Sequence, residues 1–361
     1  MLEILFIIFS ILLLLVSANS LIYGTIKLSQ FLRISPIWTA VSIVALGTSI
    51  PEIVIGVSAI DKGLYDASVS VVLGSNITNI LLIIGLSALI FPFKIPRKEI
   101  FRGEEFVGRK QKFVKKINPP LFLEEKRFSN FVNFNKINSF LYKIFKGKLS
   151  SIYIILITAT ITYSLFLFHN NLSVSAGTIL LVIMGFFVFS TLNTIQIKKQ
   201  KLKKAPVKDK NKILLFSKIS FSIIFGSIGL YLGGEILIHS ILRLAEILQI
   251  AESTMIISVV AIGSSFPELF LAFRSVAKGF SSVMLGAILG TNIINILVVG
   301  SITAWKNINV ISDKVSVEYN LWMIFSTVFI GILLFVRQKF GRIEGLILCS
   351  LYIIFLTRAF V

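Results

Sequence analysis

The stretch VALGTSIPEIVIG, Val44 to Gly56, places hydroxyl side chains, a proline and the charged Glu52 inside an otherwise apolar run. The pattern returns 216 residues later as VAIGSSFPELFLA, Val260 to Ala272. The same offset aligns LGSNITNIL at 73–81 with LGTNIINIL at 289–297 without a gap. A chain that repeats polar motifs in register over this distance consists of two copies of one unit.

The composition is that of a membrane protein. Of the 361 residues, 55% are hydrophobic and only 15% are charged, and the mean hydropathy is +0.90. A soluble domain carries about a quarter charged residues. Apolar stretches near the roughly 20 residues that a helix needs to cross a bilayer recur along the whole chain. We expect an all-α membrane protein with ten transmembrane helices, at residues 3–23, 37–60, 67–92, 151–168, 174–195, 213–240, 253–276, 282–304, 319–336 and 343–360.

Most of the net charge of +19 lies in two loops. Residues 94–150 carry 15 Lys or Arg and 5 Asp or Glu, and residues 196–212 carry 8 Lys and 1 Asp. Basic loops remain in the cytoplasm and attract anionic lipid headgroups. We therefore expect the loops after odd-numbered spans to be cytoplasmic, both termini to be outside, and the protein to reside in the plasma (cell inner) membrane. Anionic lipid is the expected partner and nucleic acid is not, and binding of nucleic acid or of a regulatory partner by these loops is the alternative.

The repeat divides the chain into two units. The first unit covers residues 1–195 with the basic insertion 94–150, a basic linker covers 196–212, and the second unit covers 213–361. Each unit contains five expected spans, an odd number, so the two copies must face opposite ways across the bilayer. Inverted repeats are the architecture of secondary transporters, whose ion sites lie near the midplane between the halves.

The two glutamates of the repeated motif indicate a cation site. Glu52 lies near the middle of the second span, and Glu268 occupies the equivalent place in the seventh. A carboxylate at such a depth costs about 2.5–3.5 kcal/mol on insertion scales, so it persists only beside a partner, an ion or water. Because no Lys or Arg lies at a comparable depth in any span, a cation is the simplest partner.

The neighbouring residues supply further oxygen ligands. Pro51 has no amide hydrogen and displaces the carbonyl one turn back, which frees backbone oxygens in a broken helix. Ser75 and Asn79 are four residues apart, hence on one helix face, and Thr291 and Asn295 repeat this spacing. Carboxylates, hydroxyls and carbonyls are hard ligands that suit sodium or calcium rather than zinc or copper. The alternative is that these side chains only form hydrogen bonds between helices.

The motifs GTSIPE and GSNITN, repeated as GSSFPE and GTNIIN, resemble the alpha-repeats of the cation/calcium exchanger superfamily, in its sodium/calcium exchanger branch. The resemblance covers all ten spans but not the 94–150 insertion. It implies an antiporter that exchanges several sodium ions for one calcium ion by alternating access, with spans 1 and 6 sliding against the others. The implied ion ligands are the carbonyls of Ala45 and Ala261 and the side chains of Thr48, Ser49, Glu52, Ser75, Asn79, Ser264, Ser265, Glu268, Thr291 and Asn295.

The resemblance also constrains the transported ions. Many members carry Asp at the position of Asn295, including the potassium-dependent branch, which argues against potassium transport here. Proton/calcium exchangers typically show GNxxE instead of the proline-containing motif. The alternatives are exchange of another divalent ion, coupling to protons, and a cation channel, for which a ring of carboxylates suffices. His169 and His239 form no metal-ligand cluster, so we expect neither enzymatic activity nor a cofactor. Glu235 is expected at the outer interface, or on an ion-entry path.

Overall fold

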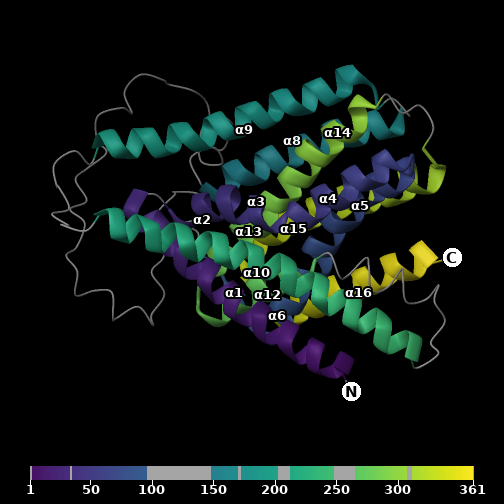
Figure 1. Ribbon diagram of the computed structural model, residues 1–361. Helices are drawn as coiled ribbons and strands as arrows, with labels where there is room; N and C mark the ends of the chain where they lie inside the picture. Colours follow the sequence, from purple (N-terminus) through teal and green to yellow (C-terminus); the bar gives the residue numbers. More distant parts are fainter. Residues whose placement is uncertain are drawn as a thin grey trace, which may run out of the picture.

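The helices of the protein follow the apolar stretches of the sequence. A computed structural model describes residues 2–32, 35–95, 148–169, 172–201, 212–247, 265–306 and 311–360 (Figure 1). Most of both basic loops, residues 96–147 and 202–211, and the first part of the seventh expected span, 253–264, lie outside these residues.

Each expected span coincides with at least one described helix. The first half contains α1 (Leu2–Leu32), α2 (Pro36–Thr39), the π-helix η1 (Ala40–Val44), α3 (Ala45–Thr48), α4 (Ile50–Asp61), α5 (Tyr65–Ile77), the π-helix η2 (Thr78–Ile83), α6 (Ile84–Ile90), strand β1 (Phe93–Lys94), α8 (Lys148–Phe168) and α9 (Val174–Lys201). The second half contains α10 (Lys212–Ile247), α12 (Phe266–Ala277), α13 (Ser281–Ile294), the π-helix η5 (Asn295–Val299), α14 (Gly300–Trp305), the π-helix η6 (Lys314–Tyr319), α15 (Asn320–Ile332), the π-helix η7 (Leu333–Arg337), strand β2 (Lys339–Phe340) and α16 (Arg342–Phe360).

The protein is a multi-pass membrane protein. Among the described residues, seven helices are long and apolar enough to cross a bilayer, or eight if the pair Pro36–Thr48 and Ile50–Asp61, bent by 44°, is one span. Large apolar side chains such as Phe186 (62% exposed) and Phe221 (68% exposed) cover the outside, as a lipid-facing surface requires. The bend confirms the expectation of a broken second span.

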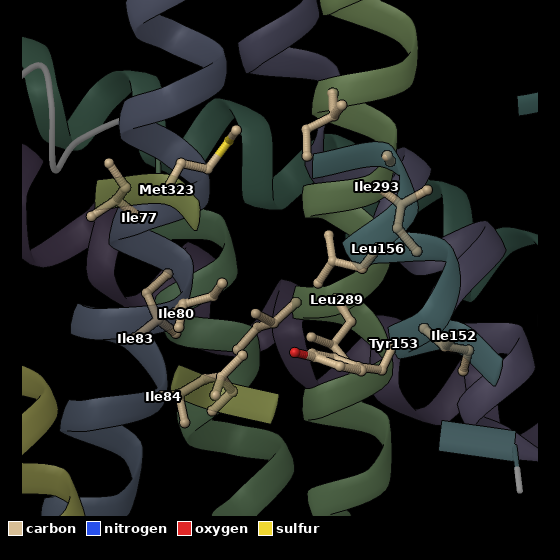
Figure 2. Packing of buried hydrophobic residues seen from close by; sticks show 14 of the residues in the cluster. Ile77, Ile80, Ile83, Ile84, Ile152, Tyr153, Leu156, Leu289, Ile293 and Met323 are labelled. Carbon is tan, nitrogen blue, oxygen red and sulfur yellow. The ribbon is translucent and has the colours of Figure 1, made fainter. Parts of the chain in front are cut away.

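Two segments form the centre of the bundle. In an apolar stretch of 18 residues within Ser281–Trp305, 94% is buried, and the share is 72% within Tyr65–Ile90. It is only 28% within Glu3–Leu32 of α1 and within Val174–Thr191 of α9. Apolar side chains from these segments and from α8 and α15 fill the core (Figure 2), which includes Ile77, Ile80, Ile83, Ile84, Ile152, Tyr153, Leu156, Leu289, Ile293 and Met323. The equivalent segments of the two repeats are therefore in contact at the middle of the molecule.

The repeat recurs in backbone geometry. α4 and α12 end in the same way, at Gly63 with φ +72° and at Gly279 with φ +80°. The Gly63 amide donates to the Ile60 carbonyl at 2.9 Å, and the Gly279 amide donates to the Val276 carbonyl at 2.8 Å. This left-handed conformation favours glycine, which explains why Lys-Gly stands at both positions.

The long helices α1 and α10, which are equivalent in the repeat, pack against each other along their length. A Cβ atom at Gly24 would lie 2.7 Å from Ile223, and one at Gly233 would lie 2.9 Å from Leu14. The residue numbers of the contacts fall from 24 to 14 on α1 while they rise from 223 to 233 on α10, so the two helices run antiparallel (Figure 1). Small residues allow this close approach of two membrane helices.

Three features differ from the sequence prediction. The outer helices are longer than expected, since α1 continues to Leu32 and α10 to Ile247. Within the described ranges, five π-helical segments interrupt the helices, although the apolar pattern gives no sign of them. A two-residue antiparallel ladder joins β1 to β2, because the chain ends of two neighbouring spans meet there.

Candidate ion-binding site

Glu52 and Glu268 each stand in the first turn of a helix whose second residue is a proline. Pro51 and Pro267 occupy the first turns of α4 and α12, where the missing amide hydrogen costs nothing. Ser49, which precedes α4, has φ −78° and ψ −3°, and its counterpart Ser265 has φ −92° and ψ 6°. The N-terminal end of a helix favours negative charge. The sequence thus places both carboxylates at the breaks of two equivalent helices.

Both carboxyl groups are buried without a partner. Glu52 is 0% exposed and Glu268 is 2% exposed. None of their four oxygens has a hydrogen-bond partner in the described part of the chain, and no described Lys or Arg forms an ion pair with them. The two groups are close enough to repel each other electrostatically. A buried, unpaired pair of carboxylates needs a cation or protons to be stable.

The two asparagines have their oxygens free and their nitrogens engaged. Asn79 is the second residue of the π-helix η2, and Asn295 is the first residue of η5. The Asn79 amide nitrogen donates to Oδ1 of Asn292 at 3.0 Å, and the Asn295 amide nitrogen donates to Oγ of Ser75 at 2.9 Å. Both Oδ1 atoms are buried and lack a partner among the described residues. The hydrogen bonds therefore leave an acceptor, rather than a donor, available on each amide.

The hydroxyl groups divide into engaged and free ones. Thr48 and Thr291, one from each half, are hydrogen-bonded at 3.1 Å between their Oγ1 atoms. Ser75 donates to the Val71 carbonyl at 2.6 Å while accepting from Asn295. The Oγ atoms of Ser49 and Ser265 are buried without a described partner. The site thus joins residues of both halves through direct contacts.

The backbone ligands are placed only in the first half. The Ala45 carbonyl accepts the Ser49 amide at 2.9 Å and, more weakly, the Thr48 hydroxyl at 3.4 Å. Pro51 offers no amide hydrogen to the Gly47 carbonyl, as the sequence predicts. Ala261 and Ser264 lie outside the described residues. The predicted ligand set is therefore placed for ten of its twelve members, and its role in ion binding stays a prediction.

The helix crossing beside the site requires glycine at one position. A Cβ atom at Gly290 would lie 2.5 Å from the Val41 carbonyl oxygen and 2.7 Å from the Ala45 side chain. No described residue lies within 4 Å of a Cβ atom placed at the equivalent Gly74. Among the residues that the structure describes, two helices thus approach closely at Gly290 but not at Gly74.

Sequence reasoning missed Asn292. Its Oδ1 accepts from Asn79, and its Nδ2 donates to the Asn76 carbonyl at 3.2 Å, so it links both halves. Its signal was present, because the motifs GSNITN and GTNIIN place an Asn directly after Ser75 and Thr291. Glu235 lies on α10, where its 40%-exposed side chain is 3.9 Å from His239.

The ligand chemistry of the site is entirely oxygen-based. Carboxylates, amide oxygens, hydroxyls and a carbonyl are hard ligands that suit sodium or calcium. No group of three or more His, Cys, Asp or Glu side chains that could hold a metal occurs within the described ranges. A cation bound here would depend on two carboxylates supplemented by neutral oxygens.

Known proteins are similar to this chain in sequence and in fold. The sequence model of the sodium/calcium exchanger protein family matches residues 2–193 and 218–361. Inner membrane protein YrbG of Escherichia coli K12 is 26% identical over 357 residues, which cover 96% of this chain and 93% of YrbG. Sodium/calcium exchanger MaX1 of Methanosarcina acetivorans is 26% identical over 148 residues, 40% of this chain and 41% of MaX1. The solved structure of the sodium-calcium exchanger NCX_Mj has a similar fold, with a TM-score of 0.73 and 18% identity, covering 99% of this chain and 98% of that chain.

Proposed function

Because the chain belongs to the sodium/calcium exchanger family, we propose that it is a secondary antiporter that exchanges sodium for calcium by alternating access. The observation that carries this proposal is the set of buried oxygens without partners, led by the carboxylates of Glu52 and Glu268. The names of MaX1 and NCX_Mj, both sodium/calcium exchangers, support the choice of ions.

The charge of the site suits one calcium ion. Two carboxylates carry −2 together, which neutralises one divalent cation. Sodium ions in their place would use the same hard oxygens, and three of them would leave a net charge of +1. If the exchange ratio is three to one, the transport cycle is electrogenic.

We propose that ten spans form two inverted five-helix repeats. The antiparallel packing of α1 on α10 supports this arrangement, because the two helices are equivalent in the repeat and point in opposite directions. Both helices lie at the outside of the bundle with little of their surface buried. They are thus placed to slide past the central helices and to open the site to one side at a time.

The proposed topology places both termini outside the cell and the basic loops in the cytoplasm. The N- and C-termini lie at the same end of the molecule, opposite the end where α10 begins (Figure 1). An even number of spans requires this arrangement. Cysteine labelling from outside, on a Cys349→Ser background, tests it, since efficient labelling of residues 196–212 would contradict the proposed orientation.

Counter-transport in sealed vesicles tests the function. Proteoliposomes loaded with sodium should take up calcium when diluted into sodium-free buffer, and vesicles without internal sodium should not. Calcium entry that is independent of internal sodium would identify a channel instead. Uptake driven by a pH gradient alone would identify a proton-coupled exchanger.

A further inference from the structure

A two-stranded ladder closes the turn between η7 and α16. β1 pairs antiparallel with β2, so that Phe93 faces Phe340 and Lys94 faces Lys339. The two phenyl rings are buried and stack with their centroids 4.8 Å apart, which fixes the register. Gln338, just before β2, has φ +55°, a left-handed conformation that is uncommon outside glycine and needs support from its surroundings. The register of the ladder is thus set by buried groups.

This register places two lysines directly opposite each other. Cross-strand neighbours have Cβ atoms about 4.5–5.5 Å apart, and like charges at such positions destabilise the pair. Lys94 and Lys339 are both exposed, and neither forms an ion pair within the described residues. The structure keeps a repulsive pair that a bound anion would relieve.

A positively charged pocket adjoins the lysine pair. It has a volume of about 670 Å³ and is lined by Pro92, Val336, Arg337, Lys339, Gly341, Arg342, Ile343 and Glu344. Its one carboxylate is already engaged, because Glu344 is 2.8 Å from the Arg337 guanidinium and accepts the Gly341 amide at 2.9 Å. Among the residues that the structure describes, Lys339 and Arg342 therefore have no carboxylate partner beside Lys94.

The same pocket has an apolar edge. Val336 is 68% exposed and Ile343 is 70% exposed. Val336 belongs to the last turn of a membrane span and Ile343 to the first turn of the next. The pocket therefore lies where a span meets the headgroup layer, with cations and apolar side chains together. A ligand that contacts both the cations and the apolar side chains must be anionic at one end and apolar at the other.

We propose that this pocket binds an anionic phospholipid, with its phosphate between Lys94, Lys339 and Arg342 and its acyl chains along Val336 and Ile343. The uncompensated lysine pair, the pocket and the exposed apolar edge each support this ligand. An inorganic phosphate shares the anionic chemistry but would leave the apolar edge unused.

Thermal unfolding of the purified full-length protein in detergent, with added lipid, tests the proposal. Phosphatidylglycerol should raise the Tm more than phosphatidylcholine does. In the variant Lys339→Gln/Arg342→Gln the apparent affinity for phosphatidylglycerol should fall about thirty-fold, from the contribution of each cation near a membrane surface. Lys306→Gln, an exposed lysine at the end of α14, should leave this affinity unchanged.

A second variant distinguishes a lipid site from a purely structural role. Lys94→Gln should raise the Tm in lipid-free detergent, because it removes the repulsion, yet it should reduce the shift that phosphatidylglycerol causes. It also keeps the test valid if the double variant does not fold. Equal lipid responses of wild type and Lys94→Gln would overturn the proposal. A full shift caused by inorganic phosphate alone would overturn the assignment to lipid.

Discussion

Replacement of either central glutamate by glutamine should nearly abolish calcium binding. Glu52→Gln and Glu268→Gln each replace one carboxylate oxygen by an NH₂ group and remove one of the two negative charges in the first turns of α4 and α12. A bound calcium ion would then keep one uncompensated positive charge. The new amide would also bring two N–H donors next to oxygens that would otherwise face the cation.

The burial of the site sets the size of this effect. Glu52 and Glu268 are 0% and 2% exposed, so water cannot replace the missing charge. Removing one partner of a buried charge pair costs about 3–5 kcal/mol. Since each 1.4 kcal/mol is a factor of ten, calcium affinity should fall by roughly two to three and a half orders of magnitude. The effect should be similar at both positions, because the repeat gives them equivalent places.

Calcium titration calorimetry on purified protein measures this loss, and sodium-dependent calcium uptake in proteoliposomes follows its consequence. Asp61→Asn is the matched control, because it removes a carboxylate from the exposed end of the same helix as Glu52. Its affinity should match that of the wild type. Near wild-type calcium affinity in a folded Glu52→Gln or Glu268→Gln protein would refute the assignment of the site.

Three other variants test the surroundings of the site. Asn295→Asp adds a third carboxylate to the group, so calcium flux measured between about pH 6 and 8 should show stronger proton competition than in the wild type, whose flux should not respond to potassium. Asn292→Ala removes the acceptor of the Asn79 amide, so it should raise the KM for calcium more than it lowers the maximal rate. A general folding defect would instead lower the amount of active protein and leave the KM unchanged. Gly290→Ala forces a Cβ atom against a carbonyl oxygen at 2.5 Å, so it should lower the stability by about 1–3 kcal/mol in a thermal unfolding assay. Gly185→Ala is the control and should leave the stability unchanged, because no described atom lies within 4 Å of its new Cβ. Equal Tm values for the two variants would contradict the close helix crossing.

Much of this fold could be predicted from the sequence because the polar residues are costly in a membrane. Glu52, Pro51 and their copies at 268 and 267 stand out against an apolar background, and their spacing of 216 residues defines the repeat. The lengths of the apolar stretches then predict which segments cross the membrane. The membrane fold and the family follow from these few positions.

The parts that could not be predicted depend on contacts between distant residues. The π-helical turns at Asn79 and Asn295 shift the helix register locally, and the apolar pattern does not report a change of one residue in a turn. The role of Asn292 depends on its hydrogen bonds to Asn79 and Asn76 in the other half. The ladder of Lys94 and Lys339 arises only because two loop ends meet in space.

The hydrogen bonds of the site also break the symmetry of the repeat. Asn79 donates to Asn292, which is the repeat equivalent of Asn76. In a symmetric site Asn295 would therefore donate to Asn76, but it donates to Ser75 instead. The same atoms in equivalent positions therefore adopt two different arrangements. An inverted repeat can open to the opposite side of the membrane when its halves exchange conformations. In the proposed alternating-access cycle, Asn79 and Asn295 should exchange these two arrangements when the site opens to the other side, and a structure of that second state with unchanged partners would contradict this expectation.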